Sequence, residues 1–459
     1  METPQRLNVN ALIDESRIGG FQIVVFALCS ICLLLDGFDV QSMGYVAPAL
    51  TQEWKIAPAA LGNVFGAAPF GILIGSLLFS MLADKFGRRP VLLGLTFYFA
   101  VTTLLTARAS TIEELLAIRF LAGIGLGGIM PNAVALVGEY SPRKSRVLIM
   151  MLVGNSFSAG AAIGGFVAAW LIPNLGWRSV FYFGGAIPLV LTVAMFFMLP
   201  ESLPFLVLRR KNLDQARRWV QRLNPSLHVS PSTDLVTTDA ARKGVPIVNL
   251  FRDGRGLGTL ALWVINFMNL LNLYFLSNWL PTLVRDAGHS TQTAVLMGAT
   301  LQLAGTIGAL ALSWMISRTG FVPALAVGFL GGAVSIAFIG QPGLSLVLLF
   351  AVVAVAGIGV VGGQAGVNAL AATLYPTDLR ATGVGAGLGI GRIGAIVGPV
   401  VGGQLLALHW QNQQLFLAAA VPAGISAVVM LGMRWLLPKQ ETTPIGIRAE
   451  VETNRNQSD

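Results

Sequence analysis

The sequence predicts an all-α membrane protein in which twelve transmembrane helices form two pseudo-symmetric six-helix bundles. Composition is the first observation behind this prediction: the 459 residues are 54% hydrophobic and 11% charged, with a mean hydropathy of +0.72, whereas soluble domains are about 25% charged. The second is that twelve apolar stretches are long enough to cross a hydrocarbon core about 30 Å thick. The third is a polar segment at 200–256 that separates six of these stretches from the other six.

The candidate spans follow one another along most of the chain. They cover residues 21–50, 57–82, 90–108, 112–140, 147–172, 179–199, 257–284, 292–317, 321–340, 344–375, 381–409 and 414–437. The expected domains are an N-terminal segment (1–20), a first bundle (21–199), a central loop (200–256), a second bundle (257–437) and a C-terminal tail (438–459). The central loop carries prolines, serines and ten basic residues, which interrupt the apolar pattern.

The basic residues indicate how the chain is oriented in the membrane. Of the 30 lysines and arginines, two fall inside spans (Arg119 and Arg392), four lie at one set of span ends (Lys55, Arg108, Arg178 and Arg285), and the other 24 lie on the opposite side. Cytoplasmic loops are rich in Lys and Arg, so we expect both termini to be cytoplasmic. This distribution also explains the net charge of +9 without a nucleic-acid partner, because the charges form no continuous stripe.

Short motifs recur at matching places in the two halves. Gly-Ile-Gly-Leu-Gly-Gly at 123–128 is followed by Tyr140 and Arg146, and Gly-Ile-Gly-Val-Val-Gly-Gly at 357–363 is followed by Tyr375 and Arg380. Alternating-access transporters are commonly built from such repeats, with a substrate site at the midplane between them. The repeat therefore predicts a transporter with a central site.

Two motifs make the chain resemble the major facilitator superfamily. Leu82-Ala-Asp84-Lys-Phe-Gly87-Arg88-Arg89 is similar to its signature cytoplasmic loop, and Arg119-Phe-Leu-Ala-Gly123-Ile-Gly125 is similar to its fourth-span motif. Ser80 stands where the family usually has Gly, and the second-half counterpart at 317–321 lacks the Asp and the final Arg. The resemblance implies an asymmetric inner gate of charges, for which we expect Asp84, Arg88, Glu139, Arg146 and Arg380.

Within the superfamily, the chain resembles the aromatic acid:proton symporters, which include transporters of 4-hydroxybenzoate, benzoate and protocatechuate. The resemblance rests on Leu35-Asp36-Gly-Phe-Asp39 with Gly44-Tyr-Val-Ala-Pro48, Met130-Pro131-Asn132 with Glu139-Tyr140, Pro200-Glu201-Ser202, and Gly391-Arg392-Ile-Gly394-Ala-Ile-Val-Gly398-Pro399. It implies proton-coupled uptake of an aromatic carboxylate across a bacterial inner membrane. A monomer is the default of the superfamily, and we expect one here.

Asp36 and Asp39 are acidic residues well inside a span. An Asp at the centre of a membrane helix costs about 2.5–3.5 kcal/mol, and residues three apart share one helix face. The other acidic residues and the three histidines map to loops, tails or span ends, so a proton carrier buried in the transport path must be Asp36 or Asp39. Alternatively, one Asp only pairs with Arg119, which the helical rise places at a similar depth. We favour a role in proton coupling for all three residues.

Arg392 is the second embedded cation and lies near the midplane of the eleventh span. A planar guanidinium can bind a carboxylate through two parallel hydrogen bonds, so we expect Arg392 to hold the acid group of the substrate. The structural alternative is that its side chain binds backbone carbonyls freed by the neighbouring glycines. We favour substrate contact.

Polar side chains in further spans could contact the substrate or only join helices. The seventh span carries Asn266, Asn269 and Asn272 at helical spacing on one face, followed by Tyr274, Asn278 and Trp279. Their amides could bind a ring hydroxyl and their aromatic rings could flank the substrate, but interhelical hydrogen bonds explain them equally well. Further polar residues of the fifth, eighth and tenth spans lie at a depth in the membrane where they could contact the substrate: Asn155, Gln302, Gln364 and Asn368. The sequence leaves both interpretations open.

The sequence therefore predicts a proton-coupled importer of an aromatic carboxylate. The alternatives are a proton-coupled transporter of another organic anion or of a sugar, a drug exporter, and a non-transporting membrane sensor. A drug exporter of this superfamily is expected to carry a Gly-Pro pair in its fifth span, where residues 154–165 contain no proline. Arg392 suits an anion better than a neutral sugar.

We expect neither enzyme activity nor a cofactor or metal. No nucleophile, base and orienting group converge in the sequence, and no phosphate-binding loop is found. Cys29 and Cys32 lie in the first span, where small buried thiols are a better interpretation than a redox pair. The expected partners are the substrate, protons and membrane lipid.

Overall fold

The computed structural model describes residues 6–210, 212–224, 227, 230, 233–237, 247–376 and 379–436. The predicted tail at 438–459 and parts of the predicted central loop lie outside the described residues. Within the described part, twelve helices are long and apolar enough to cross a membrane. Helices satisfy their backbone hydrogen bonds internally, which hydrocarbon requires of any spanning segment. The predicted fold class is confirmed.

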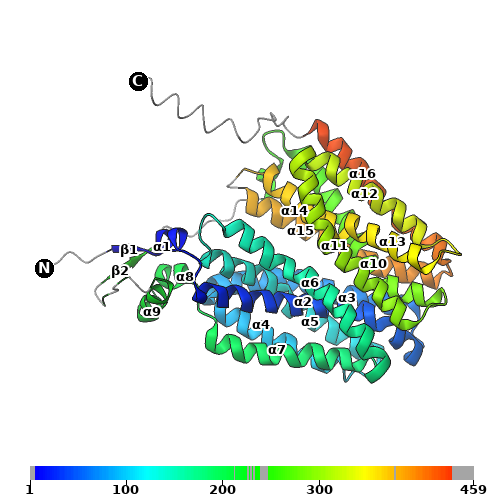
Figure 1. The fold of residues 1–459 in the computed structure, drawn as a ribbon, viewed down its shortest axis with the longest axis horizontal. Coiled ribbons are helices and arrows are strands. Elements are labelled where there is room, and N and C mark those ends of the chain that lie inside the picture. The colour runs from blue at the N-terminus through cyan, green and yellow to red at the C-terminus, as the bar shows by residue number, and fades with distance from the viewer. Residues whose placement is uncertain are drawn as a thin grey trace.

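Two six-helix bundles make up most of the molecule. The first contains α2 (Gly20–Trp54), α3 (Pro58–Phe86), α4 (Arg88–Thr106), α5 (Ile112–Tyr140), α6 (Arg146–Leu175) and α7 (Arg178–Met198). The second contains α10 (Gly256–Asp286), α11 (Thr291–Thr319), α12 (Phe321–Ile339), α13 (Leu346–Gly357), η2 (Ile358–Gly362), α14 (Gly363–Leu374), α15 (Arg380–Ala407), α16 (Asn412–Gly432) and η3 (Met433–Trp435). Figure 1 shows them side by side, the first in blue to green and the second in green to red.

The tenth span is interrupted by one turn of π-helix, which the sequence analysis did not predict. Residues Ile358–Gly362 of η2 join α13 to α14 without ending the span. A π-turn inserts a residue into the helical ladder and disturbs its regular hydrogen bonds. Asn269 of α10 donates to the carbonyl oxygen of Val360 in this turn, at 3.0 Å. A side chain from the neighbouring helix therefore satisfies part of the irregular backbone.

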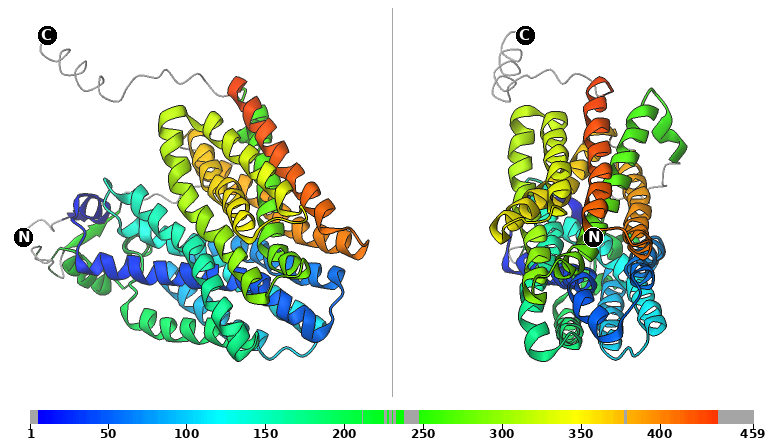
Figure 2. Two further views of the ribbon diagram at one scale, coloured as in Figure 1. Left: turned by 45° about the vertical axis from the view of Figure 1, so that its right-hand side comes forward. Right: turned by 90° about the vertical axis from the view of Figure 1, so that its right-hand side faces the viewer.

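The two bundles contact each other in one half of the membrane-spanning region. We call the end where α2 ends and α3 begins the sealed end, and the end where α2 begins the terminal end. Hydrogen bonds between the bundles join Gln41 to Ser277 and Gln302, and Arg285 to the carbonyl of Pro48. A Cβ on Gly62 of α3 would lie 2.9 Å from the carbonyl oxygen of Pro399 in α15. These positions lie toward the sealed end, and Figure 2 shows the bundles inclined to each other.

A small peripheral unit covers the terminal end of the first bundle. It consists of β1 (Arg6–Asn8), α1 (Val9–Glu15), α8 (Leu203–Leu208), α9 (Leu213–Leu223) and β2 (Asp234–Val236). The two strands pair in parallel, with Leu7 opposite Leu235. Val9 and Ile13 are buried in the same hydrophobic cluster as Ala216 and Val220 of α9. The N-terminus and the segment after α7 therefore fold together, and η1 (Ile247–Phe251) then leads into α10.

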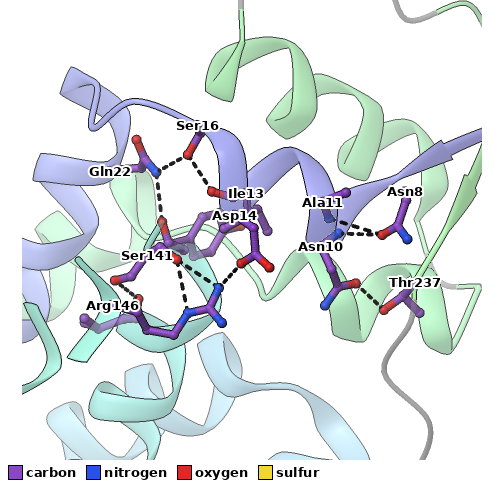
Figure 3. Close-up of polar contacts among 12 residues, drawn as sticks. Asn8, Asn10, Ala11, Ile13, Asp14, Ser16, Gln22, Ser141, Arg146 and Thr237 are labelled. Carbon is purple, nitrogen blue, oxygen red and sulfur yellow. Dashed lines mark hydrogen bonds and ion pairs between the residues drawn. The ribbon is translucent and has the colours of Figure 1, made fainter. Parts of the chain in front are cut away.

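Polar contacts fix the peripheral unit to the first bundle (Figure 3). Asn8 caps α1 by accepting hydrogen bonds from the backbone N–H groups of Asn10 and Ala11. Asp14 forms an ion pair with Arg146 at the start of α6, and Arg146 also donates to the carbonyl oxygen of Ser141. The unit thereby holds the loop between α5 and α6.

The first bundle depends on close backbone contact between α3 and α5. A Cβ on Gly75 would lie 1.9 Å from the carbonyl oxygen of Ile124, a distance that forces the helices apart. We predict that Gly75→Ala lowers the thermal stability of the detergent-purified protein, because overpacking a tight contact costs about 1–3 kcal/mol. The midpoint of thermal unfolding measures this effect.

Gly94→Ala in α4 is the matched control, since a Cβ at Gly94 meets nothing within 4 Å. Alanine is favoured over glycine in a helix by about 1 kcal/mol, so this variant should be unchanged or slightly more stable. Equal unfolding midpoints for Gly75→Ala and Gly94→Ala would contradict the described contact.

Candidate functional site

Asp39 and Arg119 form a buried ion pair within the first bundle. Arg119 donates from Nη2 to Oδ2 of Asp39 at 2.5 Å and from Nη1 to Oδ1 at 3.2 Å, and Thr103 donates to Oδ1 at 2.9 Å. Both charged side chains are 0% exposed. The guanidinium also lies over the ring of Phe181, 5.7 Å from its centroid. Of the two aspartates, it is therefore Asp39 that pairs with Arg119, and the pair links α2 to α5.

Asp36 has different surroundings, although it lies one turn earlier on the same helix. Its side chain is buried, and its carboxylate forms no hydrogen bond within the described part of the chain. Its carboxyl group lies within range of the charge of Asp39 on the same helix and of Arg392 on α15, and Tyr274 on α10 lies within range of the charges of Asp36 and Arg392. Residues from both bundles thus approach each other near the middle of α2, α10 and α15.

Arg392 is a half-buried cation in the middle of α15. Its guanidinium forms neither an ion pair nor a hydrogen bond with the residues that the structure describes. The alternative in which Arg392 binds backbone carbonyls of its own glycine-rich helix therefore has no support in the geometry. An unpaired guanidinium inside a membrane protein is costly, and its five N–H groups can bind a carboxylate.

Four of the predicted amide ligands bind one another. Asn269 donates to Oε1 of Gln364 at 2.9 Å, and Gln364 donates to Asn266 at 3.0 Å and to Asn368 at 3.1 Å. The network ties α10 to α14 within the second bundle. Asn266 and Asn269 are buried, whereas Gln364 and Asn368 are half-buried. These contacts give Asn266, Asn269 and Gln364 a role in joining helices, whereas Asn368 binds Gln364 within α14.

The remaining predicted ligands lie in several different environments. Asn272 is fully buried, and neither atom of its amide group has a partner in the described part of the chain. Trp279 donates to the carbonyl oxygen of Pro399 and contacts Phe65 edge-on, so its ring packs toward the sealed end. Asn155 is half-buried on α6. Tyr274 thus lies within range of the charge of Arg392, whereas Trp279 packs against Pro399 and Phe65.

Gln302 takes part in a hydrogen-bonded lock between the bundles. It donates to Oε1 of Gln41 at 2.9 Å and to Oγ of Ser277 at 3.0 Å, while Gln41 donates to the carbonyl oxygen of Ser277 at 2.6 Å. All three side chains are at most 5% exposed. We call these three residues the interbundle lock. The sequence offers Gln302 as a residue that contacts the substrate or joins helices, and it does not single out the other two, although all three are polar residues inside spans.

The predicted gate residues divide into separate groups at the terminal end. Arg88 forms an ion pair with Asp84 at 2.6 Å and reaches Glu139 at 3.5 Å, which links α3, α4 and α5 within the first bundle. Arg146 pairs instead with Asp14 of the peripheral unit. Arg380, at the start of α15, is exposed and forms no ion pair with the described residues. The charges of the two halves are arranged asymmetrically.

Glu201 holds the first turn of α4, where backbone N–H groups lack helical partners. Its Oε1 accepts hydrogen bonds from the backbone N–H groups of Arg88 at 2.8 Å, Arg89 at 3.2 Å and Ser202 at 2.9 Å. Burial raises the pKa of the Glu201 carboxyl, and these N–H groups act in the opposite direction. A carboxylate at a helix N-terminus is stabilised by the helix dipole. The contacts give Glu201 the role of a helix cap.

Removing one member of the buried pair should destabilise the protein strongly. Asp39→Asn leaves the charge of Arg119 inside the bundle without a counter-charge, which costs about 3–5 kcal/mol. We predict a large fall in the midpoint of thermal unfolding in detergent. The control is Glu53→Gln, which breaks the Glu53–Arg178 pair whose side chains are 46% and 40% exposed, and exposed pairs contribute about 1 kcal/mol or less. Equal effects would contradict the described burial.

Breaking the interbundle lock should favour opening of the sealed end. Gln302→Leu removes two hydrogen bonds and leaves Oε1 of Gln41 without this donor; an unpaired buried polar group costs about 1–3 kcal/mol. Spin labels on Arg108→Cys and Leu408→Cys, in a background lacking the native cysteines, report the distance between the bundles at this end. We predict that the population of molecules with a long distance between the two spin labels is about tenfold higher in Gln302→Leu than in the parent protein.

Gln413→Leu is the control for the lock, because it breaks a Gln413–Gln341 hydrogen bond that lies within the second bundle. Its distance distribution should match that of the parent protein. The same shift in both variants would show that Gln302 does not act between the bundles.

Comparison with known proteins places this arrangement in a family. A sequence model of the Major Facilitator Superfamily matches residues 29–386 and 262–455. Among solved structures, a bacterial homolog of the human lysosomal transporter Spinster, inward-facing and occupied, superposes with a TM-score of 0.72 at 16% identity, covering 93% of this chain and 100% of that one. A mutant of the nucleoside transporter NupG gives a TM-score of 0.67 at 14% identity, covering 91% and 100%. These two likenesses concern the fold alone.

Several curated relatives match over nearly their whole length. The 4-hydroxybenzoate transporter PcaK of Pseudomonas aeruginosa is 39% identical, covering 93% of this chain and 96% of the relative. The gallate transporter of Pseudomonas putida is 37% identical, covering 93% and 94%, and the benzoate transport protein of Acinetobacter baylyi is 33% identical, covering 98% of both. The chain therefore belongs to the major facilitator superfamily of transporters and, within it, to the family of these aromatic acid transporters.

Proposed function

We propose that this protein imports an aromatic carboxylate together with protons by alternating access. The observation that carries the proposal is the half-buried guanidinium of Arg392 in the middle of α15, which forms no ion pair or hydrogen bond with the described residues. A site formed by both bundles can be exposed to one side of the membrane and then to the other when the bundles rock. As a member of this superfamily, the protein is a transporter and not an enzyme.

Arg392 is proposed to bind the carboxylate of the substrate. Its planar N–H groups match the two oxygens of a carboxylate, and the bond replaces water that the guanidinium loses inside the membrane. The half-buried Tyr274 lies within range of both Arg392 and Asp36, so its ring is proposed to flank the aromatic ring of the substrate. The names of the relatives support this substrate class, since they include transporters of 4-hydroxybenzoate, gallate and benzoate.

Asp36 is proposed to couple protons to the substrate. An ionised Asp36 balances the charge of Arg392 and repels an incoming carboxylate, whereas a protonated Asp36 leaves Arg392 free to bind the substrate. Proton and substrate therefore favour each other's binding, which is what symport requires. One proton with a monovalent acid is electroneutral, and a second proton would add about 2.3 kcal/mol of driving force per 100 mV. The Asp39–Arg119 pair is proposed to transmit the effect of Asp36 protonation within the first bundle.

The orientation follows from the basic residues, which gather at the terminal end. We infer a cell inner membrane location with both termini in the cytoplasm, because basic residues are retained on the cytoplasmic side. The contacts at the sealed end then support an inward-open conformation, in which the half-buried Arg392 is reached from the cytoplasm. The protein is proposed to act as a monomer surrounded by lipid.

Uptake of labelled 4-hydroxybenzoate, gallate and benzoate into cells that express the protein tests this proposal. We predict accumulation of at least one acid, and its loss when a protonophore is added. Arg392→Ala should lower the uptake rate at limiting substrate by thirtyfold or more, since an unpaired carboxylate in a desolvated site costs about 2–5 kcal/mol. Asp36→Asn should abolish accumulation against a gradient while retaining exchange of labelled for unlabelled acid.

Arg108→Ala serves as the control, because Arg108 is an exposed cation at the sealed end. Its uptake should equal that of the parent protein at equal expression. The proposal is wrong if no acid accumulates, if accumulation is insensitive to the protonophore, or if Arg392→Ala transports as well as Arg108→Ala.

A further inference from the structure

The helix α9 of the peripheral unit has two chemically different faces. Ala216 and Val220 are 0% exposed and belong to the hydrophobic cluster that α9 shares with α1 and α8. The adjoining face carries the exposed Arg218 and Arg222 with the half-buried Gln215 and Trp219, which follow the spacing of one helical stripe; Trp219 packs against the edge of the cluster. Because the apolar face is already buried in the protein, the polar face is the one available for a partner.

This polar face forms a shallow groove. It has a volume of about 360 Å³ and is lined by Gln215, Arg218, Trp219, Gln221 and Arg222. The guanidinium of Arg222 lies over the ring of Trp219, 5.0 Å from its centroid. Arg218 and Arg222 form no ion pair with the residues that the structure describes, whereas the neighbouring Arg217 pairs with Asp214 at 2.8 Å. Among the described residues that line it, the groove therefore offers two positive charges without an ion-pair partner and no carboxylate.

The groove lies at the level where the first span begins. Trp219 stacks on Phe21, the second residue of α2, with ring centroids 5.4 Å apart and an angle of 24° between the planes. Ile23, two residues further along α2, is 56% exposed, as expected of a side chain that faces lipid. Tryptophan is enriched at the boundary between the hydrocarbon and the headgroups. The stack fixes the height of the groove at this boundary.

We propose that the α9 groove binds the headgroup of an anionic phospholipid. The two free arginines match the charge of a lipid phosphate, the glutamine amides can donate to its oxygens or to those of a glycerol headgroup, and Trp219 holds the groove beside the lipid. Arginine residues near an anionic membrane surface are attracted to its lipids. Such a lipid would anchor the peripheral unit, and through Asp14 and Arg146 the start of α6, to the membrane.

Lipid binding to the full-length protein tests the proposal independently of transport. The protein in detergent is titrated with phosphatidylglycerol or phosphatidylcholine, and bound lipid is counted by native mass spectrometry. Arg218→Gln with Arg222→Gln should weaken phosphatidylglycerol binding about thirtyfold, the factor that corresponds to about 2 kcal/mol. Phosphatidylcholine binding should be unchanged.

Lys55→Gln with Arg108→Gln is the matched control, since it removes two exposed positive charges at the sealed end. It should retain phosphatidylglycerol as the parent protein does, and unfolding midpoints verify that both double variants are folded. Equal phosphatidylglycerol binding by the two double variants overturns the proposal. Displacement of the lipid by an equal concentration of inorganic phosphate also overturns it, because the groove would then be a site for a soluble anion.

Discussion

Hydrocarbon offers no hydrogen-bond partners, and every polar group that the bundles bury must be matched by the protein itself. Asp39 and Arg119 satisfy this constraint inside the first bundle, where two guanidinium–carboxylate bonds are completed by Thr103. The amides that join α10 to α14 satisfy it inside the second bundle. Because most buried polar groups find partners within their own bundle, each bundle can move as a body without exposing unpaired charge to lipid.

Three of the groups that are not matched in this way involve both bundles. Arg392 and Asp36 come from different bundles, and neither has a close partner in the described structure. The side-chain amide of Gln302 donates hydrogen bonds to Gln41 of the other bundle and to Ser277 of the neighbouring α10. A change in protonation or the arrival of an anion therefore alters the energy of the interface far more than that of either bundle. In an equilibrium between two arrangements of the bundles, a few kcal/mol at such positions is enough to shift the populations.

The sequence was sufficient for the fold because hydropathy and span length are local properties. Because charged residues are rare inside membrane spans, the sequence alone also singled out Asp39, Arg119 and Arg392 as candidate site residues. It could not decide which Asp meets Arg119, since residues one turn apart share a helix face and the neighbouring helices select the partner. The sequence offered Gln302 as a residue that either contacts the substrate or joins helices, and it could not name its partners in the lock, because those depend on how the bundles meet. The π-turn η2 has no distinct signature among the glycines of the tenth span.

The parallel pairing of β1 with β2 has a consequence for the order of folding. β2 is synthesised about 230 residues after its partner β1, and all six spans of the first bundle lie between the two strands. At about 5–20 residues per second, the strand waits roughly 10–45 seconds. During this interval Val9 and Ile13 lack the part of their hydrophobic cluster that α8, α9 and β2 later supply. Closure of this two-stranded sheet therefore marks the moment when the first half of the protein is complete.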